Sequence, residues 1–429
     1  MNKNLKNIVS ICMLITILCA LIITITSLNK AENLNISNST NNENKQNETT
    51  TQTSGFTFQN AKEHINENIN FENNFGGSNN DQVHDVFKLE NYYLIGTSQS
   101  TDFYFENTSK NTVFILICND LGNPQSIYTY EFENSINYIS SKIFNNDIYI
   151  LISSNCTILL KFNLQTKQFN VSVTTNSTPI ALLTSGEPII VCKQNNKTEF
   201  NFVLSQTQFL LEENTVNIVL GCEYLNGTLI MLNTTNKFLI GILTKNHFEV
   251  LQTFNNFTTT EINITNKNFI ISAKSLTEHK ILILDMTFNL VNELTLNTAE
   301  YTKLLNINNT NYLFYKQNNL LKVISFCNHA EQLNTALISN DVSNLNILLL
   351  NNNFYVLIEN STNQLEILTL DLSFNKLNQI TFNTNNNFNI VSLTPHNNSV
   401  FMVGNFNNTN QIITTTFGNI DFYVAELKL

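Results

Sequence analysis

The chain has 429 residues, a formal net charge of −11 and only 13% charged residues. This acidic balance argues against nucleic-acid binding, because phosphate backbones are bound through clustered basic residues. Asparagine dominates the composition, whereas tryptophan and arginine are absent. The length suits two or three ordinary domains or one large repeat fold.

The N-terminal segment predicts a membrane anchor. Lys3 and Lys6 precede residues 8–28, an apolar stretch broken only by Ser, Thr and Cys. About 20 such residues span a bilayer as a helix. The lysines are expected to keep residues 1–7 in the cytoplasm and to place the rest outside. The alternative is a cleaved signal peptide, but no small-x-small cleavage site follows Leu28. We therefore expect a single-pass membrane protein with an extracytoplasmic C-terminal domain, secreted only if the segment is cleaved.

Residues 29–54 are rich in Asn, Thr and Glu and contain little to bury, which predicts a disordered stalk. From residue 55 to residue 429 the chain reads as successive short strands with almost no helical periodicity. An apolar run after an Asn-rich turn recurs every 40 to 46 residues or so, following a first gap of about 56, a period typical of β-propellers. The equivalent positions are Tyr93, Tyr149, Ile189, Leu229, Phe269, Tyr312, Tyr355 and Phe401.

Counting these units predicts an all-β fold, an eight-bladed β-propeller, with seven blades and one irregular insertion as the alternative. The last unit ends with its third strand, Phe422–Leu427, so it lacks an outer strand. Residues 65–75, which precede the first unit, are expected to supply that strand. Such a pairing would close the ring and remove an open sheet edge.

Both ends of this region carry a recognisable motif. Gly76-Gly77-Ser78 is followed by Asp81, and residues 418–427 read Gly-Asn-Ile-Asp-Phe-Tyr-Val-Ala-Glu-Leu. These segments resemble the GGSxxD repeats of secreted bacterial β-propeller proteins, the SBBP-like group, although the middle repeats have lost the motif. In that family one strand of this kind is followed by an outer strand and the next GGSxxD. The resemblance implies a propeller fold, export and ring closure, but no single activity.

Several classes of propeller enzyme are excluded by composition. Sialidases clamp a substrate carboxylate with arginines, and quinoprotein dehydrogenases, WD40 and kelch repeats depend on tryptophan motifs. The six histidines form no HExxH or HxH pair, and no calcium loop or phosphate cradle is present. The tightest cluster is His84 with Asp81 and Asp85, but strict alternation along a strand would place His84 opposite Asp85. We therefore predict no catalytic residue, no metal site and no cofactor.

Two longer connections are the candidate binding loops. Residues 97–111 and 405–419 both join the second and third strands of a unit, in the first and last units. These units are neighbours in a closed ring, so both loops should rise from one face. The aromatic residues Phe103, Tyr104, Phe105 and Phe406 are expected to offer a surface for sugars or peptides; plain variation in loop length is the alternative.

The sequence favours a non-catalytic binding module for a glycan, a cell-wall component or a protein. A structural scaffold of an envelope complex and a degenerate extracytoplasmic hydrolase or lyase are the alternatives. Carboxylates converging on the central channel would favour the enzyme. The ligand and the oligomeric state stay open at this point.

Overall fold

The computed structural model describes residues 51–52, 62–63 and 68–428, apart from 106–107, 109–110, 225–226, 266, 297–298, 300, 328–331, 340, 363, 385–387, 397–398 and 408–416. All of these residues belong to one compact unit, Glu48–Leu429. The predicted cytoplasmic end, the membrane helix at residues 8–28 and residues 29–50 of the stalk lie outside the described residues. In the described part of the chain, no helix is both long enough and apolar enough to span a bilayer.

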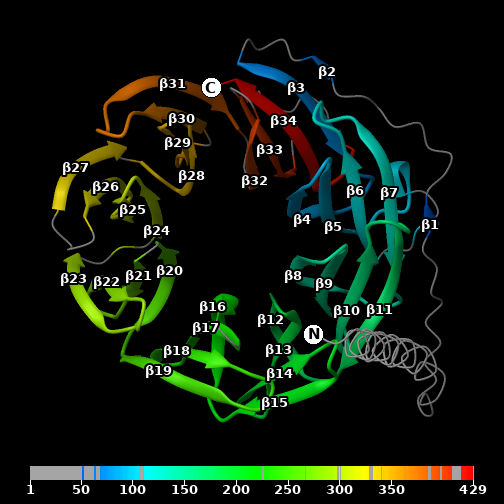
Figure 1. Cartoon of the computed structure of the whole chain (residues 1–429). Helices are drawn as coiled ribbons and strands as arrows, with labels where there is room; N and C mark the ends of the chain where they lie inside the picture. The colour runs from blue at the N-terminus through cyan, green and yellow to red at the C-terminus, as the bar shows by residue number, and fades with distance from the viewer. Residues whose placement is uncertain are drawn as a thin grey trace, which may run out of the picture. The chain divides into compact units, whose positions relative to one another are not determined.

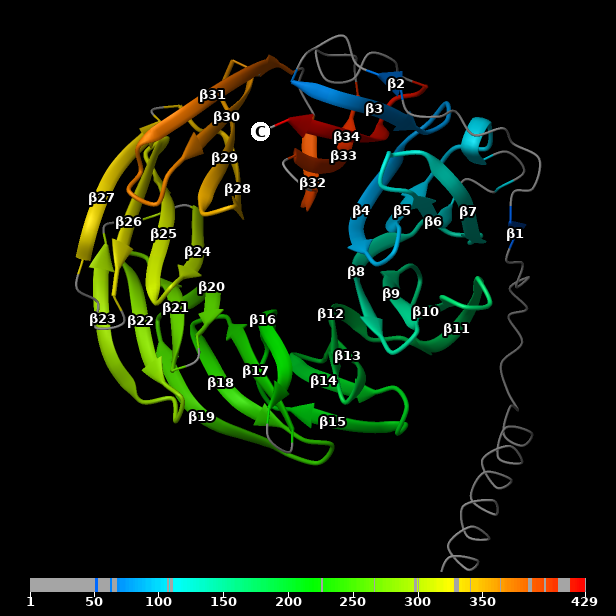
Figure 2. The ribbon, with the colours of Figure 1, turned by 45° about the horizontal axis from the view of Figure 1, so that its top comes forward.

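Eight antiparallel sheets surround a common axis, so the eight-bladed prediction is confirmed and the seven-bladed alternative is wrong (Figures 1 and 2). In each blade the first strand lies nearest the axis, and the four strands follow one another outward, except that in blade 8 the fourth position is filled from the N-terminal side.

The strands of the first four blades have the following bounds. Blade 1 contains β4 (Asp81–Lys88), β5 (Tyr92–Ser98), β6 (Thr112–Cys118) and β7 (Pro124–Glu131), and blade 2 contains β8 (Asn137–Phe144), β9 (Asp147–Ser153), β10 (Thr157–Asn163) and β11 (Gln168–Thr175). Blade 3 contains β12 (Thr178–Ser185), β13 (Glu187–Gln194), β14 (Lys197–Phe202) and β15 (Thr207–Leu211), and blade 4 contains β16 (Thr215–Tyr224), β17 (Gly227–Thr234), β18 (Lys237–Leu243) and β19 (Phe248–Asn255).

The second half of the ring repeats this order. Blade 5 contains β20 (Thr258–Ile264), β21 (Asn268–Lys274), β22 (His279–Asp285) and β23 (Leu290–Leu296), and blade 6 contains β24 (Tyr301–Ile307), β25 (Thr310–Gln317), β26 (Leu320–Phe326) and β27 (Gln332–Ser339). Blade 7 contains β28 (Asn344–Leu350), β29 (Asn353–Glu359), β30 (Gln364–Leu370) and β31 (Lys376–Asn383), and blade 8 contains β32 (Asn389–His396), β33 (Ser399–Phe406), β34 (Asp421–Lys428) and β3 (Ile69–Phe75).

The two ends of the propeller meet in blade 8. Strand β3 pairs antiparallel with β34, with Phe75 opposite Phe422, which is the pairing expected for residues 65–75. Two short upstream strands extend the outer edges further: β1 (Thr51–Gln52) pairs with β7, and β2 (Lys62–Glu63) pairs with β3. Residues 51–52, expected to be part of a disordered stalk, are therefore strand, because the edge of β7 supplies backbone partners.

The hydrophobic core of the described residues consists of seams between neighbouring blades. Eight apolar clusters are found, and each joins one pair of adjacent blades. Successive residues of a strand serve opposite seams: in β17, Ile230 and Leu232 pack toward blade 3, whereas Leu229 and Met231 pack toward blade 5. This two-residue alternation explains why the second and third strands are apolar throughout.

Asparagine has a structural role in the hairpin turns. Asn308 and Asn309, and likewise Asn351 and Asn352, adopt positive φ angles of 49–67°. Two successive residues in this conformation form the turn whose twist matches that of paired strands. Asparagine tolerates the conformation better than most residues, so the Asn-rich turns noted in the sequence are physically favoured.

A second recurring device joins neighbouring blades at their inner strands. Most inner strands contain a bulge near their third residue, such as those after Val83 and Thr259. The amide of Asn233, in blade 4, accepts a hydrogen bond from Thr259 N (2.8 Å) and donates one to Thr259 O (2.9 Å). Asn405, in blade 8, makes the same two bonds to Val83 of blade 1, at 2.8 and 2.9 Å. These bonds satisfy backbone groups that the bulge removes from the ladder.

Candidate functional site

Three of the four aromatic residues predicted to form a binding surface are buried. Tyr104 and Phe105, in a short 3₁₀ helix η1 (Phe103–Phe105), are 2% and 0% exposed, and Phe406 is 1% exposed. Only Phe103 is substantially exposed, at 45%. The expectation that these rings face a ligand is therefore wrong for Tyr104, Phe105 and Phe406. The seam between blades 8 and 1 covers Tyr104 and Phe105, and the seam between blades 7 and 8 covers Phe406.

The two long loops do meet, as expected from their places in neighbouring blades. Phe417, at the end of the second loop, lies with its ring 5.2 Å from that of Phe103 and 6.1 Å from that of Tyr104. Tyr104 also contacts Phe75 at 5.3 Å. Aromatic side chains from both loops thus extend the core over the closure seam, and their role in the described residues is packing.

Two buried carboxylates organise the loops at the same seam. Asp81 accepts hydrogen bonds from Gly77 N (2.6 Å), Ser98 Oγ (2.6 Å) and Ser100 Oγ (2.7 Å). Asp421 accepts bonds from the backbone N–H groups three and four residues earlier, at 3.1 and 2.6 Å. Asp81 of the Gly-Gly-Ser motif and Asp421 of the C-terminal motif therefore hold loop backbone in place by hydrogen bonds. The motifs alone did not reveal this structural role.

Burial perturbs both of these groups. It raises the pKa of Asp81 in spite of hydrogen bonds from Ser98 and Ser100. Burial likewise raises the pKa of Asp421 to about 6, with Asp81 adding to the increase and the backbone bonds opposing it. Burial disfavours the charged form of a carboxylate, so both groups hold a proton more readily than an exposed aspartate does.

On the inner wall, His84 and Asp85 both contact Tyr138 of blade 2. The His84 ring stacks on the Tyr138 ring with centroids 4.6 Å apart, and Tyr138 Oη donates to Asp85 Oδ2 at 3.1 Å. Ser141 Oγ also donates to Asp85, at 2.8 Å. The expectation that alternation would separate His84 from Asp85 is wrong, because His84 occupies the bulge of β4. Burial lowers the pKa of His84 to about 4, so the ring is neutral at pH 7.

A serine, a histidine and a glutamate lie together in blade 8. Ser399 Oγ donates to Glu426 and to the carbonyl of His396 (2.6 Å), while His396 Nδ1 lies 3.2 Å from Glu426 Oε1. A hydrolytic triad requires the hydroxyl to donate to the imidazole. Here the Ser399 hydroxyl donates to the Glu426 carboxylate and to the His396 backbone carbonyl instead of to the His396 ring, so the three residues do not form such a triad. In the described part of the chain, no group of three or more His, Cys, Asp or Glu residues is placed to hold a metal ion.

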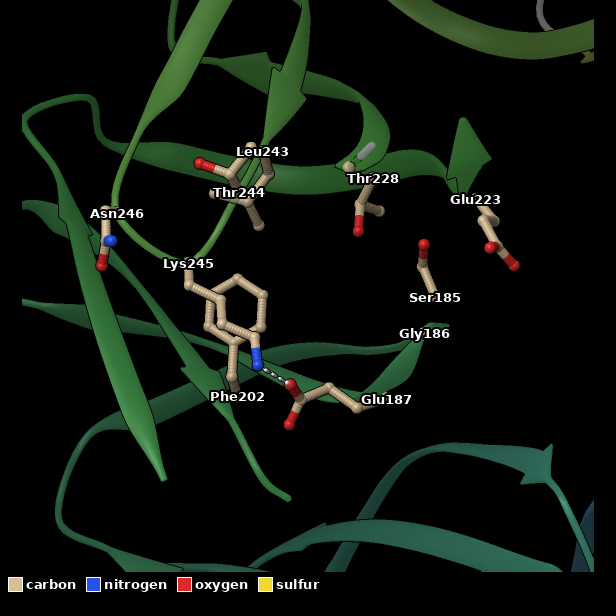
Figure 3. A pocket seen from close by; sticks show the side chains of 11 residues that line it. Ser185, Gly186, Glu187, Phe202, Glu223, Thr228, Leu243, Thr244, Lys245 and Asn246 are labelled. Carbon is tan, nitrogen blue, oxygen red and sulfur yellow. Dashed lines mark ion pairs between the residues drawn. The ribbon is translucent and has the colours of Figure 1, made fainter. Parts of the chain in front are cut away.

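A hollow with a mixed polar lining lies between blades 3 and 4 (Figure 3). It has a volume of about 570 Å³ and is formed by turns that join β12 to β13, β16 to β17 and β18 to β19. The sequence contains no motif for it, because each turn is ordinary by itself. The lining side chains that carry polar groups are Ser185, Glu187, Glu223, Thr228, Thr244, Lys245 and Asn246.

An ion pair crosses this hollow from one blade to the other. Lys245 Nζ lies 3.1 Å from Glu187 Oε1, and Ser205 N donates to Glu187 Oε2 at 2.8 Å (Figure 3). Burial by itself would raise the pKa of Glu187, but Ser205 and Lys245 together lower it. Glu187 is therefore ionised and fixed in position. Glu223 is exposed on the other side of the hollow, and no ion pair to it is found among the described residues.

The arrangement offers hydrogen-bond donors and acceptors over a short distance. Hydroxyls of Ser185, Thr228 and Thr244 both donate and accept, Glu223 accepts, and Lys245 donates. Phe202, at 5% exposure, closes the back of the hollow. A ligand rich in hydroxyl groups could satisfy such a lining, whereas an apolar ligand would leave its polar groups unpaired.

Comparisons with known proteins bear on the fold. No family model matches the sequence, and no curated protein matches it. The solved structure of the dihydro-heme d1 dehydrogenase NirN in complex with DHE is similar, with a TM-score of 0.51 and 8% identity over 78% of this chain and 73% of that one. The Dos1 propeller has a TM-score of 0.49 and 14% identity, covering 82% and 94% of the two chains. At such identities the likeness concerns the fold alone.

Proposed function

We propose that this protein is a membrane-anchored, extracytoplasmic binding module without catalytic activity, and that it binds a glycan between blades 3 and 4. The observation that carries this proposal is the 570 Å³ hollow lined by hydroxyl, amide, carboxylate and ammonium groups. Sugar hydroxyls donate and accept hydrogen bonds at once, so they complement a lining of this kind.

The inner wall supports a non-catalytic role. A hydrolase acting on a glycosidic bond needs two carboxyl groups facing each other across a gap. Asp85 is instead engaged by Tyr138 and Ser141. Glu261 accepts a bond from Leu304 N at 2.7 Å and lies 2.9 Å from Lys303 Nζ. Both carboxylates thus link neighbouring inner strands, and their hydrogen-bonding capacity is used in doing so.

The proposed localisation rests on the sequence. The apolar stretch at residues 8–28, the preceding lysines and the resemblance to secreted propellers all favour export with retention at the membrane. With the propeller outside the cell, the hollow would be accessible to extracellular or cell-wall glycans. We propose this extracytoplasmic, membrane-anchored localisation together with the binding role.

The proposal is tested with the full chain purified in detergent. It is applied to a glycan array that includes peptidoglycan fragments, and the best oligosaccharide is then titrated calorimetrically. Glu223→Gln and Asn246→Ala remove exposed polar groups of the hollow, and each should weaken binding about tenfold, as expected for loss of a hydrogen bond in a polar site. Lys193→Ala is the matched control, because Lys193 lines a polar hollow of about 560 Å³ between blades 2 and 3. Absence of saturable binding, or equal binding by all variants, would refute the assignment.

A further inference from the structure

A second hollow lies between blades 4 and 5 and has a volume of about 730 Å³. It is formed by the turns that join β17 to β18 and β21 to β22, and by the connection from β19 to β20. The hollow between blades 3 and 4 is formed by the turns at the other ends of such strands. Because neighbouring strands of a blade are antiparallel, the two hollows open on opposite faces of the ring.

Carbon atoms form most of the wall of this second hollow, although many of the residues around it are polar. Phe257 packs against the apolar cluster of the seam between blades 4 and 5, and it also lines the hollow. Leu276, at the tip of the β21–β22 turn, is 100% exposed and lines the hollow as well. The apolar seam therefore continues into the hollow through Phe257, and Leu276 adds an apolar side chain at the rim.

Hydrogen bonds fix the backbone on both sides of the hollow. In the β21–β22 turn, Ser275 N donates to Glu278 O at 2.9 Å, and Glu278 N donates to Ser275 Oγ at 3.1 Å. On the other side, Asn256 N donates to Asn236 O at 2.7 Å. The hollow is thus a formed feature of the folded chain, as ligand pockets usually are.

The equivalent hollow between blades 2 and 3 lacks these apolar side chains. The two hollows correspond residue by residue, because the first residue of β12 and the first residue of β20 pair in the same way with the next strand. In this correspondence Ser177 takes the place of Phe257, and Asn195 takes the place of Leu276. The hollow between blades 2 and 3 has a volume of about 560 Å³ and a mainly polar wall. Of these two equivalent hollows, only the one between blades 4 and 5 is mainly apolar.

One basic side chain at the apolar hollow has no acidic partner. Lys274 lines the hollow, and no ion pair to it is found among the described residues. The carboxylate in the lining, Glu278, lies 3.8 Å from Lys280 Nζ, which also lies 3.0 Å from Glu293. An anionic group of a ligand can therefore pair with Lys274 without displacing an existing ion pair.

We propose that the hollow between blades 4 and 5 binds a small apolar molecule that carries one anionic group. The apolar body packs between Phe257 and Leu276, and the anionic group pairs with Lys274. The volume is that of a small-molecule pocket, and such pockets combine an apolar wall with a few polar groups. Burial of apolar surface supplies most of the affinity. This site lies on the face opposite the glycan hollow and does not depend on the glycan proposal.

The probe is the dye anilinonaphthalene sulfonate, which has an aromatic body and a sulfonate and fluoresces more strongly in apolar surroundings. Phenylnaphthylamine has the same rings without the sulfonate and serves as the neutral comparison. Both dyes are titrated into the full chain in lipid nanodiscs, with empty nanodiscs as the blank. We expect a single saturable site above the blank, and slower amide hydrogen exchange in the β21–β22 turn when the sulfonate dye is bound.

Three variants locate the site. Leu276→Asn introduces the residue of the equivalent hollow and should weaken both dyes about tenfold through lost apolar contact. Lys274→Gln should weaken the sulfonate dye about threefold, as for a partly exposed ion pair, and should leave the neutral dye unchanged. Leu121→Asn is the control, because Leu121 is also an exposed leucine in a turn, at 60% exposure, but belongs to blade 1.

Three results would overturn the proposal. They are the absence of saturable binding above the blank, equal affinities of Leu276→Asn and Leu121→Asn for the dyes, and equal weakening of both dyes by Lys274→Gln. Circular dichroism establishes that each variant is folded. Glycan binding by Leu276→Asn should equal that of the natural chain, which distinguishes failure of this proposal from failure of the glycan site.

Discussion

Replacing the asparagine that joins two blades should destabilise the ring by a predictable amount. Asn233 is 4% exposed and its amide holds both backbone groups of Thr259, which is 3% exposed. Asn233→Leu keeps the volume but leaves one N–H and one C=O buried without partners. Each such group costs about 1–3 kcal/mol, so we expect a loss of about 3–5 kcal/mol.

The equivalent variant at the closure seam provides an internal comparison. Asn405 makes the same two bonds to Val83, but Asn405 itself is half-buried. Water can therefore reach part of the site, and Asn405→Leu should cost about 2–3 kcal/mol, less than Asn233→Leu. Asn217→Ala is the control. Its side chain is exposed and only accepts a bond from Asn233, at 2.8 Å, so its removal should cost less than about 1 kcal/mol.

The assay is urea unfolding of Glu48–Leu429, the compact unit. Because tryptophan is absent and the chain has 13 tyrosines, unfolding is followed by tyrosine fluorescence together with far-UV circular dichroism. Coincidence of the two transitions tests whether the ring unfolds as one unit. If both leucine variants stay within about 0.5 kcal/mol of the natural protein, the backbone groups at the bulges do not need these partners, and the reasoning is wrong.

Three other predictions concern the seam between blades 8 and 1. Gly122 and Gly186 have φ angles of +69° and +68°, respectively, but a Cβ would overlap a neighbouring ring only at Gly122. Gly122→Ala should therefore cost at least about 1 kcal/mol more than Gly186→Ala in urea unfolding. Phe105→Ala should cost about 3–5 kcal/mol because it leaves a cavity in the seam, whereas Phe103→Ala should cost less than about 1 kcal/mol. Burial raises the pKa of folded Asp421 to about 6, above the ordinary aspartate value of 3.8, so its stabilising contribution is present below pH 3.8 and is lost as pH rises through 6. Asp421→Asn should therefore remove up to about 3 kcal/mol of the pH dependence of the unfolding free energy between pH 4 and 7.

Each of these has an outcome that contradicts it. Equal effects of the two glycine substitutions would mean that the Phe71 ring moves aside freely. A large effect of Phe103→Ala would show that its ring packs more tightly than a 45% exposed side chain should. An unchanged pH profile in Asp421→Asn would mean that Asp421 titrates as an ordinary carboxyl. Asp81→Asn provides the comparison, because the pKa of Asp81 is also raised by burial.

Much of the architecture could be predicted because its signals are local or periodic. The eight equivalent apolar runs around residues such as Tyr93 and Phe401 each form the second strand of a blade. The Asn-rich turns mark hairpins because asparagine adopts positive φ readily. The missing outer strand of the last unit, and the split motif at the two ends, were sufficient to predict that β3 pairs with β34.

The candidate site could not be predicted in the same way. The sequence shows that Phe103, Tyr104, Phe105 and Phe406 are aromatic and lie in or near long loops. Whether a ring faces solvent or the core depends on what covers it, and here the covering residues Phe75, Phe114 and Phe417 come from different parts of the chain. Burial is decided by contacts between residues far apart in sequence, which no local pattern records.

The same reason separates what the sequence by itself determined from what required the tertiary structure. Strand period, blade number and closure follow from the spacing of apolar runs and turn residues, since backbone pairing depends mainly on local alternation. The ion pair of Glu187 with Lys245 and the hollow that it crosses arise only when separate turns and strands are brought together. Those features decide what the ring can bind, because a binding surface is a property of the assembled blades.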